Sequence, residues 1–338
     1  MLKIRPAGLV LYSAIIVIVC MFIIYLNMYR STVHVFPNID PTINNKIKSE
    51  RVTERDQRCR NTIKNSKSDW FKESYNEKIM PFWGVDNLGI NQDVFQWWLS
   101  IQGSTRTNLE PVLKGLFKEG IEEHRKRNGT QNNECVSCAV VGNSGNLKNS
   151  GYGEAIDKHD IVIRFNQGPT TSFEKDVGSK TTHRLMYPES MKAIKKDTSF
   201  TLIPFKPLDV EWLLSAITNG TIKKTYRPVT PRIYVNVPKI NIIHPEFIRY
   251  VHVNWINRQG RYPSTGAIGV ALSLQICDSV DVYGFGMDDN RGWHHYWENL
   301  PPGSAQAFRK TGVHDADVER AWLERLKTEG VISINIGK

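Results

Sequence analysis

CAVVGNSGNLKNSGYGEAIDKHDIVIRFN, residues 138–166, decides the fold class, because two short apolar runs flank a loop rich in glycine and asparagine. The runs are short, bounded by turn residues and rich in β-branched side chains, so we predict buried strands over residues 138–141 and 160–165. Gly142–Asn146 is the turn that leaves the first strand.

The same alternation of short apolar runs and longer helical stretches continues along the chain. Further strands are predicted over residues 200–204, 232–237 and 280–283, and helices over 209–217, 245–254 and 266–277. Such alternation predicts a single Rossmann-like α/β domain, with a mainly parallel sheet and helices on both faces. Ligands of such sheets bind beyond the carboxyl ends of the strands, so the loops there are the first candidates for a site.

Two loops have the composition of a binding site. Gly142–Asn146 offers backbone N–H groups with Asn and Ser side chains, which suit a phosphate or sugar hydroxyls. It lacks a G-x-G-x-x-G pattern, so a simple tight turn remains an alternative. Residues 261–266, RYPSTG, place hydroxyl caps and a glycine at the start of a helix. A helix start of this kind suits an anion, although ordinary N-capping also explains the hydroxyls.

Histidines concentrate near the C-terminus. Three of the nine, His294, His295 and His314, lie within about 20 residues, in the runs GWHHYWE (292–298) and GVHDAD (312–317). Histidine exchanges protons near neutral pH, so this concentration predicts acid/base chemistry, whereas any one of them taken alone is more often a structural residue.

The N-terminus predicts a membrane anchor. Residues 8–26 are nineteen in number and carry no charge, and as a helix they span ~28 Å, about the thickness of a bilayer's hydrocarbon core. Lys3 and Arg5 precede this span and only Arg30 closely follows it, which favours a cytosolic N-terminus. We therefore predict a single-pass type II membrane protein, with a cytosolic tail over residues 1–7 and a transmembrane signal anchor over 8–26.

Charge separates a stem from a globular domain. The net charge is +10, but residues 1–66 hold ten Lys and Arg against four Asp and Glu, so the other 272 residues carry only +4. The excess of positive charge is therefore not a nucleic-acid footprint, and no nucleic acid is expected as a partner. Residues 27–66 are polar and without apolar periodicity, as in an extended stem, and 67–338 form the lumenal domain.

Sequons and cysteines agree with a lumenal location. Asn128 and Asn219 each begin an Asn-Gly-Thr glycosylation sequon. Cys20 lies within the predicted span, which leaves Cys59, Cys135, Cys138 and Cys277 for an oxidising compartment, and these four permit three pairings. We favour Cys138 with Cys277, because this bond would clamp the first strand to the helix that Gly266 opens, and hence Cys59 with Cys135.

Four blocks of the sequence resemble the motifs of one enzyme family. CAVVGNSGNLKNSGYGEAIDKHDIVIRFN, GRYPSTGAIGVALSLQICDSVDVYGFG, WHHYWEN and HDADVE are similar, in order and spacing, to the large, small, third and very small motifs of animal sialyltransferases. The resemblance extends to nearly all of the chain after the stem. It is strongest to the β-galactoside α-2,3-sialyltransferases that act on Gal-β-1,3-GalNAc.

The resemblance implies a function. It implies a GT-A-like fold, an inverting transfer of sialic acid from CMP-sialic acid to the 3-hydroxyl of a terminal galactose on a glycoprotein or glycolipid, a Golgi location, and no metal or other cofactor. His314 would be the general base, His295 would meet the phosphate, and Gln102 and Tyr187 would contact the acceptor. The residues that would line the donor site are Asn143, Ser144, Asn146, Asn166, Tyr226, Tyr262, Ser264, Thr265, Gly266, Gly286, Trp293 and His294.

Alternatives stay open at this point. Asp315-Ala-Asp317 is formally a D-x-D metal signature, and with the three histidines it would suit a metal-dependent lumenal hydrolase. A membrane-anchored glycan-binding protein would use a platform of tryptophans, namely Trp97, Trp98, Trp293 and Trp297. The sequence decides neither the oligomeric state, a homodimer included, nor whether the carrier is a lipid or a protein.

Overall fold

The computed structural model describes residues 20–24, 63–104, 108–121, 135–287, 294–298 and 312–337. The chain divides into two units, Met1–Glu54 and Arg55–Lys338. In the first unit residues 20–24 are helical, while the rest of the predicted anchor, the tail and nearly all of the stem lie outside the described residues. Within the part of the chain that is described, no helix combines the length and the apolar character that crossing a bilayer requires.

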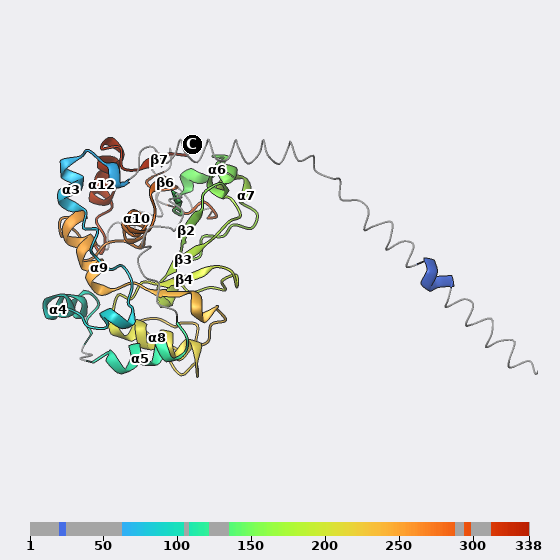
Figure 1. The fold of residues 1–338 in the computed structure, drawn as a ribbon, viewed down its shortest axis with the longest axis horizontal. Helices are drawn as coiled ribbons and strands as arrows, with labels where there is room; N and C mark the ends of the chain where they lie inside the picture. Colours follow the sequence, from blue (N-terminus) through green and yellow to red (C-terminus); the bar gives the residue numbers. More distant parts are fainter. Residues whose placement is uncertain are drawn as a thin grey trace, which may run out of the picture. The chain divides into compact units, whose positions relative to one another are not determined.

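The second unit is built on one sheet (Figure 1). Its described residues contribute seven strands, and every neighbouring pair is parallel. The strands are β1 (Ser137–Val141), β2 (Ile161–Phe165), β3 (His183–Met186), β4 (Ser199–Leu202), β5 (Ile240–Ile242), β6 (Ser279–Tyr283) and β7 (Ser333–Asn335). Their order is β5-β4-β3-β2-β1-β6-β7, so the chain winds outward from β1 to β5 and then crosses back to place β6 on the other side of β1. The order of winding therefore reverses between β1 and β6.

Among the described residues, an α-helix lies in every crossover between these parallel strands except that from β3 to β4, which has a 3₁₀ turn, Pro188–Ser190. The helices described here are α3 (Asp69–Ser74), α4 (Gln92–Ile101), α5 (Glu110–Lys118), α6 (Gly153–Asp157), α7 (Glu174–Val177), α8 (Pro207–Ile217), α9 (Pro245–Tyr250), α10 (Thr265–Ile276) and α12 (Ala316–Thr328). A π-helical turn, Val251–Trp255, directly continues α9.

Alternate residues of β1 supply two cores, one on each face of the sheet. Cys138 and Val140 belong to the larger core, which also holds the helices α8 and α10, whereas Ala139 and Val141 belong to a smaller core with residues of α6 and α7. Because both faces are covered, all five residues of β1 are buried. The predicted sheet with helices on both faces is confirmed.

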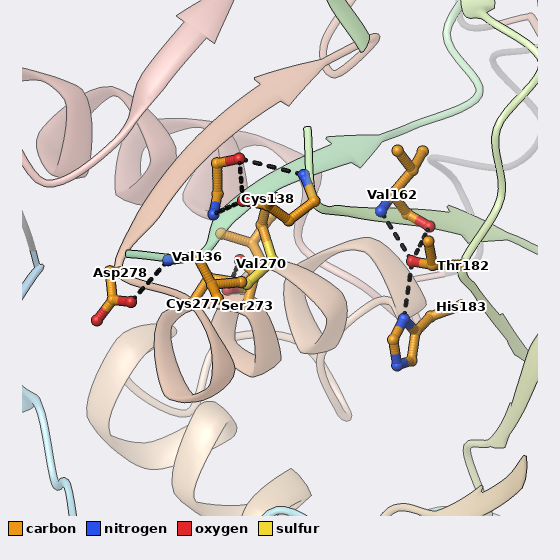
Figure 2. Close-up of a disulfide and its surroundings, with 11 residues drawn as sticks. Val136, Cys138, Val162, Thr182, His183, Val270, Ser273, Cys277 and Asp278 are labelled. Carbon is orange, nitrogen blue, oxygen red and sulfur yellow. Dashed lines mark hydrogen bonds between the residues drawn. A yellow bond between two sulfur atoms is a disulfide. The ribbon is translucent and has the colours of Figure 1, made fainter. Parts of the chain in front are cut away.

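The central helix α10 explains why the larger core is closely packed. Residues 267–274 of this helix are all buried, so it has no polar face. Gly269 lets the helix approach the sheet closely, because a Cβ at this position would overlap the ring of Phe165. Cys277, the residue after α10, forms a disulfide with Cys138 of β1 across a Cα–Cα distance of 6.0 Å (Figure 2). This predicted disulfide is confirmed; Cys135 is also disulfide-bonded, while Cys59, its predicted partner, lies outside the described residues.

One predicted strand is wrong. Residues 232–237 form no strand: Tyr234 is 89% exposed, and a short 3₁₀ turn, Val237–Lys239, follows. The edge strand β5 begins only after Pro238, since proline cannot donate a hydrogen bond to a neighbouring strand.

Candidate active site

The loops that leave β1 and β6 meet where the order of winding reverses. The N–H of Gly142 donates to the carbonyl of Tyr283 at 2.7 Å, and the N–H of Ser144 donates to the carbonyl of Gly284 at 3.1 Å. The approach is so close that a Cβ on Gly142 would overlap the Gly284 carbonyl. This is the position at which doubly wound sheets bind their ligands.

Two asparagines at this edge have buried amide oxygens that find no hydrogen-bond partner among the described residues. Asn146 is 1% exposed and its Nδ2 donates to the carbonyl of Phe285 at 3.0 Å, but its Oδ1 has no partner among the described residues. Oδ1 of Asn166, beyond the end of β2, is likewise buried without a partner in the described part of the chain. Buried polar atoms are nearly always hydrogen-bonded, so both oxygens indicate a ligand that donates hydrogen bonds.

The segment His294–Glu298 lies along the loop after β1. Ser144 and His295 form an isolated antiparallel bridge, and the N–H of Tyr296 donates to the carbonyl of Asn143 at 3.1 Å. Gly145 is required for this contact, because a Cβ there would lie 2.5 Å from Nε2 of His294. The structure therefore brings both histidines to the predicted donor loop, although they follow it by about 150 residues.

His295 is exposed and has a carboxylate partner. Its Nδ1 lies 2.9 Å from Oε2 of Glu298, and its ring stacks on Trp297 with 4.4 Å between centroids. Burial alone would raise the pKa of Glu298, but hydrogen bonds from the ring and the backbone N–H of His295 outweigh burial and lower it. An ionised Glu298 therefore lies within hydrogen-bond distance of the His295 ring.

The N-terminus of α10 forms the next part of the wall. Ser264 caps the helix by accepting from the N–H of Ala267 at 3.1 Å, and Thr265 and Gly266 occupy its first turn. A Cβ on Gly266 would lie 2.9 Å from the ring of Phe285, so this helix start is adjacent to the loop after β6. The unpaired N–H groups of this first turn suit an anion.

Glu319 of α12 holds this helix start in place. It accepts hydrogen bonds from the N–H of Ser264 at 2.7 Å and from its hydroxyl at 2.5 Å. The residue as a whole is only half-buried, but its carboxylate is enclosed, and this burial raises its pKa to about 7. Sequence reasoning missed Glu319, although it is the last residue of the HDADVE block.

His314, two residues before α12, contacts Tyr262, three residues before the start of α10. Its Nδ1 lies 2.9 Å from the carbonyl oxygen of Tyr262, and its ring meets the ring of Tyr262 edge-on at 5.0 Å between centroids. A carbonyl oxygen only accepts, so Nδ1 carries the proton and the lone pair of the neutral ring is on Nε2. Burial lowers the pKa of His314, against the smaller opposing effect of this hydrogen bond, and so favours the neutral ring.

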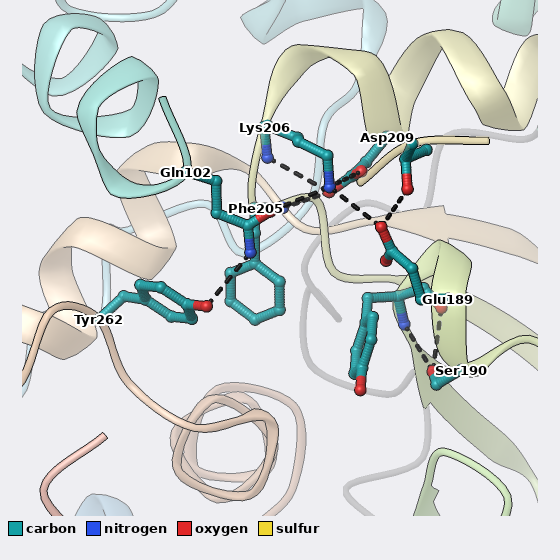
Figure 3. Close-up of polar contacts among 9 residues, drawn as sticks. Gln102, Glu189, Ser190, Phe205, Lys206, Asp209 and Tyr262 are labelled. Carbon is teal, nitrogen blue, oxygen red and sulfur yellow. Dashed lines mark hydrogen bonds and ion pairs between the residues drawn. The ribbon is translucent and has the colours of Figure 1, made fainter. Parts of the chain in front are cut away.

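A buried polar cluster lies beyond Tyr262 (Figure 3). The hydroxyl of Tyr262 accepts from Nε2 of Gln102 at 3.2 Å, and Oε1 of Gln102 accepts from Nζ of Lys206 at 2.9 Å. Tyr187 lies on the same side, through the ring of Phe205, which is 6.1 Å from that of Tyr187 and 4.8 Å from that of Tyr262.

The remaining predicted residues have varied locations. Tyr226 is 53% exposed and lies beside Lys206, and Gly286 follows β6 with a φ of 94°. Asn219 is exposed in the turn after α8. Trp293 and Asn128 lie outside the described residues.

The alternatives receive little support from the described residues. Asp315 of the D-x-D caps α12 by accepting from the N–H of Val318 at 3.0 Å, which gives this carboxylate a structural role. No group of three His, Cys, Asp or Glu suited to a metal occurs in the described ranges. Trp98 of the predicted glycan platform is fully buried, and Trp97 stacks on His252.

Comparisons with known proteins agree with this geometry. The model of glycosyltransferase family 29 (sialyltransferase) matches residues 82–331. A CMP-N-acetylneuraminate-β-galactosamide-α-2,3-sialyltransferase 1 from Homo sapiens is 50% identical over 253 residues, 75% of this chain and 74% of its own. A CMP-N-acetylneuraminate-β-galactosamide-α-2,3-sialyltransferase 2 from Mus musculus is 46% identical over 275 residues, 80% and 77% of the two chains. A crystal structure of a mammalian sialyltransferase in complex with Gal-β-1-3GalNAc-ortho-nitrophenol superposes with a TM-score of 0.74 at 43% identity, over 82% of this chain and 98% of that one.

Proposed function

The chain belongs to glycosyltransferase family 29, the sialyltransferases, and we propose that it transfers sialic acid from CMP-sialic acid to the 3-hydroxyl of the galactose in Gal-β-1,3-GalNAc. The α-2,3 linkage and the β-galactoside acceptor follow the names of relatives about 50% identical to it. The disaccharide follows the acceptor in the complex of a similar structure.

The observation that carries the mechanism is the hydrogen bond between Nδ1 of His314 and the Tyr262 carbonyl. It fixes the neutral tautomer that has its lone pair on Nε2. In the proposed reaction this nitrogen removes the proton from the acceptor hydroxyl. The hydroxyl oxygen then bonds to the anomeric carbon of sialic acid while the bond from that carbon to the phosphate oxygen breaks, and CMP leaves with the electron pair.

Negative charge develops on the phosphate as CMP leaves, and it needs a hydrogen-bond donor on the side opposite His314. With both ring nitrogens protonated, His295 donates from Nδ1 to Glu298 and from Nε2 to the phosphate. The N–H groups at the start of α10 supply further donors. Attack and departure on opposite sides, without a carboxylate nucleophile, give a single displacement with inversion, and we propose that it requires no metal.

The two asparagine oxygens that lack a partner among the described residues agree with binding of the donor. Oδ1 of Asn146 and Oδ1 of Asn166 are acceptors, and the ribose and base of CMP offer hydroxyl and amino donors. The loop from Asn143 to Asn146, with His294 and His295, forms the donor side of the proposal.

We also propose a Golgi membrane location, with the unit 67–338 in the lumen. The Cys138–Cys277 disulfide supports an oxidising compartment, and the exposed sequon at Asn219 supports passage through the secretory pathway. The apolar span 8–26 supports a type II anchor.

The test is a transfer assay with the full chain solubilised in detergent. CMP-sialic acid is incubated with Gal-β-1,3-GalNAc, Gal-β-1,4-GlcNAc or buffer, in EDTA or in Mn²⁺, and the linkage of each product is determined. We expect an α-2,3 product with inverted anomeric configuration, formed best on Gal-β-1,3-GalNAc and unchanged by EDTA. Absence of product on every galactoside would contradict the proposal. Activity only with Mn²⁺ would contradict the metal-free part of the proposal. Glycan binding without release of CMP would favour the membrane-anchored glycan-binding protein.

A further inference from the structure

Lys206 is a buried cation at the centre of several site elements. Only 6% of the residue is exposed, and it precedes the first residue of α8. Its Nζ lies 2.7 Å from Oδ1 of Asp209, 3.3 Å from Oε1 of Glu189 and 2.9 Å from Oε1 of Gln102 (Figure 3). We refer to these four residues as the Lys206 cluster.

The charge of Lys206 is retained in spite of its burial. Burial by itself would lower the pKa of Lys206, but the charges and hydrogen bonds of Asp209 and Glu189 outweigh it and raise that pKa. Burying a charge is costly unless it is paired and hydrogen-bonded; here the ammonium donates to Gln102 and Glu189 and pairs with the carboxylate of Asp209 at 2.7 Å. An ammonium with three such contacts has a fixed position.

A role in stabilising the start of α8 alone would not require the contact between Lys206 and Gln102. Asp209 already caps α8, because it accepts from the N–H of Phe205 at 2.8 Å and from the N–H of Lys206 at 3.3 Å. The contact with Gln102 adds nothing to that cap, since Gln102 follows α4 and is 104 residues away in the sequence.

The contact with Gln102 fixes which way its amide faces. An ammonium only donates, so the amide oxygen of Gln102 must face Lys206 and its Nε2 must face the opposite way. There it donates to the hydroxyl of Tyr262 at 3.2 Å, while the carbonyl of the same tyrosine accepts from Nδ1 of His314. A row of hydrogen bonds therefore runs from the buried ammonium to the residue that anchors the proposed base.

The cluster also holds the loop that carries Tyr226. Glu189 accepts a short hydrogen bond from the hydroxyl of Thr225, and the ammonium of Lys206 lies 5.1 Å from the ring centroid of Tyr226. Tyr226 is half-exposed, and its ring also meets the guanidinium of Arg227 at 5.5 Å, so Lys206 is one of two cations beside this ring.

We propose that Lys206 is a positioning residue for the acceptor sugar, which acts by orienting the amide of Gln102. The proposal rests on the proposed function, in which this side of the site receives the galactoside. Lys206 itself contacts neither substrate. It determines which hydrogen-bonding groups the acceptor meets, while the donor is held by the loops after β1 and β6.

The experiment uses two substitutions of the full chain, Lys206→Met and Lys206→Arg, with wild type and Lys180→Met. Lys180 is the matched control, because its half-buried ammonium donates to the carbonyl of His159, away from these residues. Four quantities are measured for each: the melting temperature, the affinity for CMP, and KM and kcat with Gal-β-1,3-GalNAc.

We expect Lys206→Met to lower kcat/KM for the acceptor by about 10- to 100-fold, mainly through KM, with CMP affinity changed by less than about twofold. Lys206→Arg keeps the charge but places its donors differently, so we expect wild-type stability with part of the KM defect retained. Lys180→Met should lower the melting temperature without raising the acceptor KM.

A double-mutant cycle with Gln102→Leu tests the route of the effect. If Lys206 acts through Gln102, Lys206→Met should add little to the KM defect that Gln102→Leu already has. Additive effects, or a folded Lys206 variant with the wild-type acceptor KM, would overturn the proposal. If Lys206→Met does not fold, the acceptor KM of Lys206→Arg decides: a raised KM supports the proposal and a wild-type KM overturns it. A wild-type chain that transfers nothing refutes the proposed function instead, so the two failures are distinguishable.

Discussion

Replacement of His314 tests the proposed base most directly, because the structure separates its chemical from its structural contribution. Nδ1 of the ring donates to the Tyr262 carbonyl at 2.9 Å, and the ring meets that of Tyr262 edge-on. A hydrogen bond contributes about 1 kcal/mol to stability, which corresponds to a few degrees in the melting temperature of a domain of this size. A general base contributes about 10²- to 10⁴-fold to the rate, or about 3–5 kcal/mol of transition-state free energy.

Two substitutions distinguish these contributions. His314→Ala removes both. In His314→Asn the amide nitrogen takes the place of Nδ1, so it can still donate to the Tyr262 carbonyl, but it cannot accept the acceptor's proton. We therefore expect both variants to lose about 10²- to 10⁴-fold in kcat, while His314→Asn keeps nearly the wild-type melting temperature and both keep their affinity for CMP. The measurements are initial rates with Gal-β-1,3-GalNAc, calorimetric titration with CMP and thermal unfolding.

The pH profile provides an independent check of the same reasoning. Because burial lowers the pKa of His314 below its ordinary value of 6.5, the neutral ring persists into weakly acidic solution. The acidic limb of kcat/KM should therefore lie below pH 6.5 in the wild type and disappear in the residual activity of His314→Asn. A folded His314→Asn protein with turnover within tenfold of wild type would remove His314 from the chemistry.

Three further outcomes follow from particular contacts. Gly145→Ala places a methyl group against the ring of His294 and should lower turnover by about tenfold or more at a stability cost of about 1–3 kcal/mol; normal turnover would show that this approach is unimportant. Replacement of both Cys138 and Cys277 by alanine should lower the free energy of unfolding by about 5 kcal/mol in the chain-entropy model, given their separation of 139 residues, and a loss below about 1 kcal/mol in chemical unfolding would contradict that estimate. Because burial raises the pKa of Glu319 to about 7, folding favours its protonated form. The free energy of unfolding should therefore fall by up to about 3 kcal/mol as pH rises from about 4.5 to 7. Glu319→Gln should flatten this dependence on pH, and an unchanged dependence would refute the assignment.

The strands that sequence analysis predicted share a local signal. Residues 138–141, 160–165 and 280–283 are short, mainly apolar runs rich in β-branched residues, and β1, β2 and β6 match them closely. The strands β3, β5 and β7 were not predicted; each has only three or four residues and includes at least one polar side chain. Their extended conformation depends on pairing with a neighbouring strand, which sequence periodicity does not report.

The site divides in the same way. The polar loop at Gly142–Asn146 and the clustered histidines could be predicted, because their residue types already indicate chemistry. Glu319 and Lys206 could not, since each is an ordinary surface residue type whose role comes from burial and a distant partner. Ser264, the partner of Glu319, is 55 residues away, and Gln102, the partner of Lys206, is 104 residues away.

The two histidines of the proposed reaction have different environments, and the difference matches their tasks. A base must be neutral before it accepts a proton, and His314 is half-buried, with burial lowering its pKa and a backbone carbonyl holding the proton on Nδ1. A partner for a leaving phosphate must donate, and His295 is exposed, with the carboxylate of Glu298 within 2.9 Å to compensate a positive ring. Groups of one kind take opposite roles when their surroundings differ in this way. Here the surroundings come from the topology, because His295 lies against the loop after β1 and His314 against the residues that lead into α10.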